Sequence, residues 1–269
     1  MATHIDPSAV IHPTAEVADG VTIGPFAVLG EGVRIGEGTT IDAHVVIVRW
    51  TTVGARCHIG ANAVLGGDAQ HLAYKGEPSY LEIGDDNVIR ELAVIHRSAI
   101  AGGQTVVGSH NMIMAQAHVA HDCRIGNHTI IASLAGLAGH VDVEDGAMIG
   151  GVTGIHQFVR IGAYSMVGGS SRLSQDVPPY MIAAGSPATV HGLNVIGLRR
   201  HGFGAEQRRE LKTAYRTLYR SGLNVSQALA KIKVQSGLSA PVAHLVQFVE
   251  RSKRGICSRS GASLPQHDC

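Results

Sequence analysis

The stretch that decides the fold is VADGVTIGPFAVLGEGVRIGEGTTI, residues 17–41. Its branched apolar residues recur at every sixth position, at Val17, Ile23, Leu29, Ile35 and Ile41. A small or branched residue precedes most of them by two positions, and glycine follows several of them directly. Neither the 3.6-residue period of a helix nor a simple hairpin produces this pattern. It predicts a short strand and a corner, repeated every six residues.

The same phase extends along most of the chain. It begins at Ile5 and runs to Leu65, fails at His71 and Glu77, resumes at Ile83 and continues through Ala101 to Leu173. Chance alternation in an ordinary β-sandwich would not hold one phase for so long. Three six-residue strands make one triangular coil of eighteen, so the sequence predicts a hexapeptide-repeat parallel β-helix, a solenoid that buries its apolar edge between neighbouring coils.

Two interruptions divide the chain. The failed steps bracket residues 66–80, GGDAQHLAYKGEPSY, which we expect to replace one coil and to project from the prism as a loop suited to binding. After Leu173 the prolines of QDVPPYMIAAGSPA end the ladder, and from about Gly192 the pattern becomes helical. The expected fold class is all-β with an α-helical C-terminus: a β-helix over 1–190, a small helical domain over 191–255, and a flexible tail over 256–269.

Composition narrows the functional classes. The net charge of +1 gives no overall field for nucleic acid, and no run of apolar residues is long enough to span a membrane. The N-terminal residues lack a secretory signal pattern. The four cysteines form no CxxC pair, so neither a disulfide framework nor a thiolate zinc site is indicated. We therefore expect a cytoplasmic protein without stable membrane insertion or a nucleic-acid partner.

Histidines gather where the coils stack. Residues 116–123 read QAHVAHDC, and positions eighteen apart should lie directly above one another. His121 and Asp122 then share one corner with His140, His156 and Gln157. With coils about 4.8 Å apart, this column spans roughly 10 Å. His121 is expected at the turn, outward and accessible, and His118 outward from the strand before it.

Such a corner suits acid–base chemistry. A neutral imidazole can take a proton from an alcohol, and an adjacent carboxylate fixes its tautomer. We therefore interpret His121 as a general base oriented by Asp122. No nucleophile stands beside it, because Cys123 is an inward position, and direct transfer is favoured over a covalent intermediate. Alternatives are exposed histidines without function, a zinc site recruiting His118, His121 and His140, and a surface-binding prism, which would need ordered ranks of outward threonine.

The order of motifs is more specific than the fold. HLAYKGEPS, NMIMAQAHVAHDC, LAGHVDV, GGVTGIHQFVRIGA, VGGSS, QDVPPYMIA and GLNVIGLRRHGF together resemble the acyl-carrier-protein-dependent UDP-N-acetylglucosamine O-acyltransferases, over residues 1 to about 255. This resemblance implies a left-handed coil and a homotrimer with active sites between neighbouring prisms. It also implies transfer of an (R)-3-hydroxyacyl chain from acyl carrier protein to the 3-hydroxyl of UDP-N-acetylglucosamine, the first step of lipid A synthesis. The phosphopantetheine thioester is a co-substrate, and no other cofactor and no metal is implied.

The resemblance also assigns roles to residues. His121 takes the position of the general base, Asp122 that of its carboxylate, and the N–H of Gly139 would face the thioester oxyanion. The implied substrate-binding residues are Gln70, His118, His140, His156, Gln157, Asn194 and Arg200. Met114 and Gly169 would line the acyl-chain groove, where glycine leaves room for a longer chain. An acidic carrier protein could meet Arg199, Arg200, Arg208, Arg209, Arg216 and Arg220.

Four positions depart from the common pattern of the family. The projecting loop has His71 and Ala73 in place of an acidic residue and a lysine, and Lys75 is a candidate substitute for that lysine. Ile196 and His201 replace a glutamate and an arginine at the nucleotide side. These changes keep open an acceptor with a 3-amino group. The related N-acyltransferase normally carries an additional amino-terminal domain, and a coenzyme-A acetyltransferase would not require the open Gly169.

Overall fold

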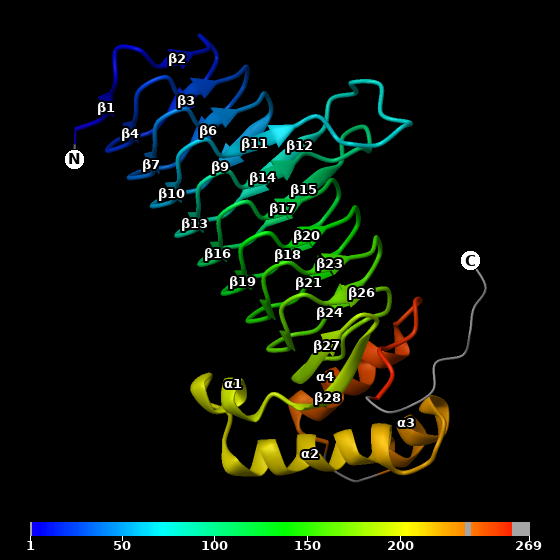
Figure 1. Cartoon of the computed structure of the whole chain (residues 1–269). Helices are drawn as coiled ribbons and strands as arrows, with labels where there is room; N and C mark the ends of the chain where they lie inside the picture. The colour runs from blue at the N-terminus through cyan, green and yellow to red at the C-terminus, as the bar shows by residue number, and fades with distance from the viewer. Residues whose placement is uncertain (1, 235–237, 260–269) are drawn as a thin grey trace.

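The computed structural model describes residues 2–234 and 238–259, and within them the chain winds into the expected left-handed parallel β-helix. The coils stack from the N-terminus toward a group of helices at the opposite end of the prism (Figure 1). Almost every strand pairs in parallel with the strand one coil away, so each wall of the prism is one sheet. We call these walls sheets A, B and C.

The strands of each sheet follow one another coil by coil. Sheet A contains β1 (His4–Ile5), β4 (Thr22–Ile23), β7 (Thr40–Ile41), β10 (His58–Ile59), β13 (Val88–Ile89), β16 (Met112–Ile113), β19 (Ile130–Ile131), β22 (Met148–Ile149), β25 (Met166–Val167), β27 (Met181–Gly185) and β28 (Ala188–Leu193). Sheet B contains β2 (Val10–Ile11), β5 (Val28–Leu29), β8 (Val46–Ile47), β11 (Val64–Gly67), β14 (Val94–His96), β17 (His118–Val119), β20 (Gly136–Leu137), β23 (Gly154–Ile155) and β26 (Arg172–Leu173). Sheet C contains β3 (Glu16–Val17), β6 (Arg34–Ile35), β9 (Thr51–Val53), β12 (Tyr80–Ile83), β15 (Gln104–Val107), β18 (Arg124–Ile125), β21 (Asp142–Val143) and β24 (Arg160–Ile161).

The second residue of most strands points into the prism. Ile113, Val119 and Ile131 are completely buried, as the six-residue pattern predicts. Burial raises the pKa of the inward thiol of Cys123 to about 12, so this side chain behaves as a small apolar residue rather than a nucleophile. The interior is a column of small and branched side chains whose outward neighbours remain available for other contacts.

The loop over residues 66–80 does not replace a coil. Ile59 pairs with Ile89, thirty positions later instead of eighteen, and β11 in sheet B is followed directly by β12 in sheet C. The loop therefore adds twelve residues to one coil, and the expectation that it stood in for a coil was wrong. It projects from the prism beside the upper coils (Figure 1). Because twelve is two repeats, the phase of the pattern survives it.

A second insertion escaped sequence analysis for the same reason. Ile89 pairs with Ile113, twenty-four positions later, so this coil carries six extra residues. They lie between β14 and β15, and Ala101, which the pattern predicts to be inward, is exposed in a turn. Both insertions leave the prism at the corner where sheet B passes into sheet C. His121 lies at the same corner, so both insertions project from the coils that precede it.

Helices close the C-terminal end of the prism. They are α1 (Val195–Arg200), α2 (Ala205–Arg220), α3 (Val225–Lys233) and α4 (Ala240–Glu250). The predicted apolar stripe of α2, which includes Leu211 and Leu218, is buried. No helix in the described ranges has the length and apolarity that crossing a bilayer requires.

The segment after α4 corrects one expectation. Ile256 forms a β-bridge with Asp176 and Arg259 one with Val190, and Cys257 is only 2% exposed. Residues 256–259 therefore pack against the end of the prism and do not belong to a flexible tail. The rest of that predicted tail, residues 260–269, lies outside the described residues.

Candidate active site

The predicted histidine column forms at the corner between sheets B and C. His121 and Asp122 follow β17, and the corresponding residues one coil on are Gly139 and His140. The backbone N–H of His140 donates to the carbonyl of His121 at 3.0 Å, so the two corners are stacked in register. The imidazoles of His121 and His140 lie at right angles with their centroids 5.3 Å apart. Stacking by eighteen residues was therefore predicted correctly.

Asp122 fixes the tautomer of His121. The Nδ1 atom of His121 lies 2.7 Å from the Oδ2 atom of Asp122. Because a carboxylate only accepts hydrogen bonds, Nδ1 carries the hydrogen, and Nε2 keeps its lone pair when the imidazole is neutral. This arrangement suits a general base, since the carboxylate also stabilises the imidazolium formed after proton transfer.

Asp122 is itself held by the second insertion. Burial pushes the pKa of Asp122 upward, but hydrogen bonds from the hydroxyl of Ser98, from His121 and from the N–H of Ala99 outweigh it and hold the pKa below the ordinary value. The backbone N–H of Asp122 donates to the hydroxyl of Thr105 at 2.8 Å. Asp122 therefore remains ionised beside the imidazole. Sequence analysis did not find Ser98, because the insertion that carries it keeps the six-residue phase.

Glycine at position 139 leaves space for the imidazole of His121. A β-carbon built at Gly139 would lie 2.5 Å from Cε1 and 2.7 Å from Nε2 of His121, too close for any side chain. The free nitrogen of His121 thus lies directly above the backbone of the next coil. Within the described residues, the N–H of Gly139 has no hydrogen-bond acceptor. The N–H of Gly139 and the free nitrogen of His121 are therefore placed side by side.

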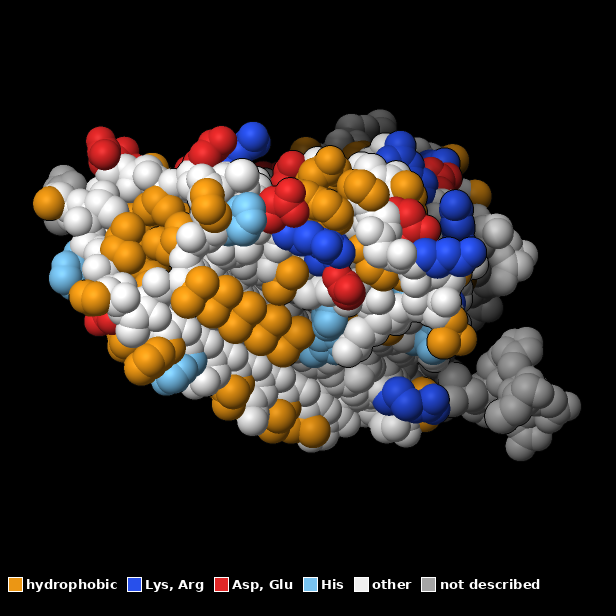
Figure 2. All heavy atoms as spheres, turned by 90° about the horizontal axis from the view of Figure 1, so that it is seen from above, with side chains coloured by type: hydrophobic (Ala, Val, Ile, Leu, Met, Phe, Trp, Pro, Cys, Tyr) orange, Lys and Arg blue, Asp and Glu red, His pale blue; other side chains and the backbone are white. Residues whose placement is uncertain are grey.

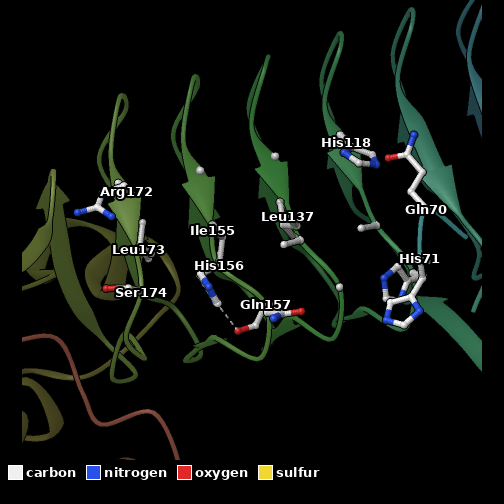
Figure 3. A pocket seen from close by; sticks show the side chains of 16 residues that line it. Gln70, His71, His118, Leu137, Ile155, His156, Gln157, Arg172, Leu173 and Ser174 are labelled. Carbon is white, nitrogen blue, oxygen red and sulfur yellow. Dashed lines mark hydrogen bonds between the residues drawn. The ribbon is translucent and has the colours of Figure 1, made fainter. Parts of the chain in front are cut away.

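A cavity of about 590 Å³ opens in front of His121 along sheet B. Its floor is formed by glycines and apolar residues of β20 and β23, and it continues to Arg172 and Ser174. Figure 3 shows His118 on one coil and His156 and Gln157 two coils further along this cavity, with Gln70 facing His118 from the projecting loop. Nδ1 of His156 lies 3.1 Å from the carbonyl of Gln157. The structure thus brings the predicted residues of sheet B together.

The projecting loop covers His121. The His71 imidazole lies edge-on to that of His121, with centroids 5.2 Å apart, so His121 is enclosed by imidazoles on two sides. His121 lies at the turn and lines the cavity, as its outward position predicts, but it is only 6% exposed in the single chain, so the expectation that it is accessible was wrong. Arg97, which lies at the start of the second insertion and holds the projecting loop, was also not identified from the sequence.

His118 lies deeper than its predicted outward position suggests. Its imidazole packs edge-on against that of His96, with centroids 5.1 Å apart, and desolvation lowers the pKa of both residues. Within the described residues the Nε2 atoms of both are buried without a hydrogen-bond partner. Burial therefore favours the neutral form of both imidazoles.

One group of side chains in the described part of the chain has the composition of a metal site. The ligand atoms of His121, Asp122 and His140 lie within 4.8 Å of one another, whereas His118 is not part of this group. The same carboxylate oxygen lies 2.7 Å from His121 and 3.7 Å from His140. A separation of 2.7 Å is that of a direct hydrogen bond. The geometry therefore favours a hydrogen-bonded base over three ligands converging on an ion.

The remaining predicted residues lie in other parts of the same chain. Met114 and Gly169 follow β16 and β25, at the corner between sheets A and B. Asn194 caps α1, where its side chain accepts from the N–H of Gly197 and donates to the carbonyl of Tyr164, and Arg200 is exposed at the end of that helix. A single chain thus does not bring these four residues to His121.

The departures from the family pattern are also placed. Ala73 and Lys75 are exposed on the projecting loop, and Ile196 is 69% exposed on α1. His201 packs near Tyr164, with ring centroids 5.0 Å apart. The arginines that were proposed to meet a carrier protein lie on α1 and α2. Arg199, Arg200, Arg209, Arg216 and Arg220 are exposed, and Arg208 is half-buried.

Comparison with known proteins gives consistent matches along the chain. Residues 176–257 match the family model described as "Udp N-acetylglucosamine O-acyltransferase; Domain 2", and residues 32–67 and 104–139 match the bacterial transferase hexapeptide model. An acyl-[acyl-carrier-protein]--UDP-N-acetylglucosamine O-acyltransferase of Trichlorobacter lovleyi is 52% identical over 94% of this chain and 98% of its own length. The enzyme of that name from Syntrophobacter fumaroxidans is 48% identical, with the same coverage of both chains.

Solved structures agree with the sequence matches. The UDP-N-acetylglucosamine acyltransferase of Bacteroides fragilis superposes with a TM-score of 0.92 at 42% identity, over 94% of this chain and 99% of that one. The acyltransferase of Francisella novicida gives a TM-score of 0.92 at 36% identity, over 98% of this chain and all of the other. The likeness covers both the prism and the C-terminal helices.

Proposed function

This chain belongs to the UDP-N-acetylglucosamine O-acyltransferase family, and from that premise we propose that it transfers a 3-hydroxyacyl chain from acyl carrier protein to the 3-hydroxyl of UDP-N-acetylglucosamine. This reaction would open lipid A synthesis. The observation that carries the proposal is the His121–Asp122 pair beside Gly139 in a cavity of about 590 Å³.

Each group has a step in this reaction. Nε2 of His121 takes the proton of the sugar hydroxyl while the oxygen attacks the thioester carbonyl. The negative charge that develops on the carbonyl oxygen meets the N–H of Gly139, and one fixed donor of this kind stabilises a transition state by roughly 3 kcal/mol. When the intermediate collapses, the C–S bond breaks and the thiolate receives the proton that His121 holds. Asp122 stabilises the imidazolium between these two steps.

The distribution of the predicted residues over separate parts of the chain supports a homotrimer. Met114 and Gly169, at the corner between sheets A and B, and Asn194 and Arg200, at the two ends of α1, can complete the cavity only if a neighbouring prism supplies them. The outer face of sheet A carries a suitable apolar stripe. Met112, Ile130, Met148 and Met166 occupy equivalent positions on successive strands, and Met112 and Met148 are 38% and 37% exposed. Figure 2 shows that hydrophobic side chains also gather in a band on the face of the prism seen from above. Such bands commonly mark an interface.

The partners follow from the same proposal. Acyl carrier protein would deliver its phosphopantetheine thioester, no further cofactor would be needed, and the reaction would take place in the cytoplasm. The exposed arginines of α1 and α2 offer a basic surface for an acidic carrier.

Reconstitution tests the proposal. The purified chain is incubated with UDP-N-acetylglucosamine and 3-hydroxyacyl carrier proteins of several chain lengths, and the products are identified by mass spectrometry. The 3-amino analogue of the sugar nucleotide is included as a second acceptor. We expect O-acylated UDP-N-acetylglucosamine, with turnover unaffected by a chelator. Loss of turnover on metal removal would favour the metal-enzyme alternative, and absence of product with every donor and acceptor would contradict the proposal.

A further inference from the structure

The largest fully buried side chain among the described residues lies beside the projecting loop and not in the His121–Asp122 pair. Arg97 is completely buried, although a guanidinium is strongly hydrated in water. It emerges at the corner between sheets B and C, one coil before His121. A buried cation in this place requires acceptors, and the loop over residues 66–80 supplies all of those that Arg97 has among the described residues.

The groups that accept hydrogen bonds from Arg97 lie in the first part of the loop, between residues 66 and 74. Nη1 donates to the carbonyl of Gly66 at 2.7 Å, and Nη2 donates to the carboxylate of Asp68. Nε and Nη2 also donate to the hydroxyl of Tyr74, at 3.1 and 2.9 Å. The planar guanidinium therefore connects residue 66 to residue 74, which fixes the path of the chain between them.

A neighbouring histidine reinforces this clamp. Nδ1 of His96 lies 2.6 Å from the carbonyl of Asp68, to which it must donate, because a carbonyl only accepts. The backbone leaves the prism at Gly66, whose φ is +74° and where a β-carbon would overlap the side chain of Thr51. The beginning of the loop is thus held at Gly66 and on both the backbone and the carboxylate of Asp68.

The clamp determines where His71 lies. His71 stands between Asp68 and Tyr74, and its imidazole contacts that of His121. The N–H of Ala73 donates to Nδ1 of His71 at 3.2 Å, so a neutral His71 carries its hydrogen on Nε2. His71 also lines the cavity. It can therefore both hold the imidazole of His121 in place and offer a donor to the acceptor substrate.

We propose that Arg97 is a positioning residue of this active site, which acts through Tyr74 and Asp68 to hold His71 against His121. The inference rests on the proposed function, because its kinetic consequence concerns the same acyl transfer. It goes beyond that function because a buried arginine outside the cavity would determine the geometry of the loop that covers the base. Misplacing a group next to a catalytic base by about 1 Å can reduce turnover by roughly 10²-fold.

Tyr74→Phe is the most informative variant. It removes the hydroxyl that accepts two of the bonds from Arg97, while the ring and Arg97 itself remain. Arg97→Met is less suitable alone, because a change at a completely buried site can prevent folding. Leu72→Ala is the matched control on the same loop, since Leu72 is fully exposed.

A double-mutant cycle distinguishes positioning from a general contribution to stability. We expect Tyr74→Phe to lower kcat/KM about tenfold, mainly through kcat, and to have less than about a twofold further effect when His71 is already alanine. Leu72→Ala should leave kcat/KM within about twofold of wild type. Equal effects of Tyr74→Phe with and without His71 would contradict the inference.

A measurement without turnover separates this inference from the proposed function. Lys75 is the sole lysine in residues 66–80 and is exposed, so trypsin reports on the freedom of the loop. We expect Tyr74→Phe and Asp68→Ala to speed cleavage after Lys75 about fivefold or more, with Leu72→Ala near the wild-type rate. Unchanged cleavage would show that the clamp does not hold the loop. If Tyr74→Phe and Asp68→Ala are cleaved faster but the wild-type chain shows no acyl transfer, the result contradicts the proposed function alone.

Discussion

The imidazole of His121 lies over Gly139 so closely that a β-carbon on that glycine would come within 2.5 Å of its Cε1 atom. The two residues belong to successive coils and are eighteen positions apart in the sequence. The repeat therefore places the base and the proposed oxyanion donor together without any loop between them.

Gly139→Ala should consequently displace the imidazole. We expect kcat to fall about 10²-fold, because the methyl group occupies the space of Cε1 and Nε2, while the melting temperature changes little. Gly192→Ala is the matched control, since a β-carbon at Gly192 meets no atom within 4 Å. Wild-type kcat in Gly139→Ala would show that His121 need not lie where the structure has it.

Asp122→Asn tests whether His121 needs the charge of the carboxylate at position 122. The amide removes the carboxylate that accepts the hydrogen of Nδ1 and stabilises the imidazolium, and we expect kcat to fall by roughly 10²–10⁴-fold with a small change in KM. Asp86→Asn is a fitting control, because Asp86 has a similar left-handed φ of 56° at a different corner. A kcat within twofold of wild type would remove Asp122 from the mechanism.

The His96–His118 pair should make stability depend on pH. Burial lowers the pKa of both below 6.5, so the unfolded chain binds protons more readily than the folded one. Their stabilising effect is complete above about pH 6.5 and is lost as the pH falls through the folded pKa, by up to about 1.4 kcal/mol per pH unit for each group.

Urea unfolding at pH 8, 6.5 and 5.5, at one protein concentration, measures this effect. His118→Gln removes one of the two titrating groups, so its free energy of unfolding should decline less steeply on acidification than that of the wild type. An equal or steeper decline in His118→Gln would contradict the burial of a neutral imidazole.

The outer face of sheet A should be an interface between copies of the chain. Met148→Arg places a charge in the middle of the apolar stripe, and we expect the trimer to dissociate in size-exclusion chromatography with light scattering. Val106→Arg makes the same change on the outer face of sheet C and should remain trimeric. A trimeric Met148→Arg protein would place the interface elsewhere.

Much of the architecture could be predicted because each six-residue repeat forms one strand and one corner of a coil. Ile113, Val119 and Ile125 each mark an inward position, and the eighteen-residue step correctly stacks His140 on Asp122. The same regularity concealed the insertion that contains Ala101, since a six-residue addition leaves the phase unchanged.

The contacts that complete the site were not predictable from periodicity. Ser98 bonds to Asp122 and His71 contacts His121 from the two insertions, and Arg97 holds the loop that carries His71. The paths of these insertions depend on tertiary contacts. A repeat within one chain also could not show where Met114 or Asn194 lies relative to His121. These residues belong to different parts of the chain and would come together only between copies.

Replacing His121 by alanine is the most direct test of the account, which assigns proton abstraction to one nitrogen. Turnover of UDP-N-acetylglucosamine with 3-hydroxyacyl carrier protein is compared with that of the wild type, and folding and oligomeric state are checked on the same samples. The account predicts that kcat falls by at least about 10²–10⁴-fold in a folded trimer. A folded trimeric His121→Ala protein with nearly wild-type turnover would contradict it.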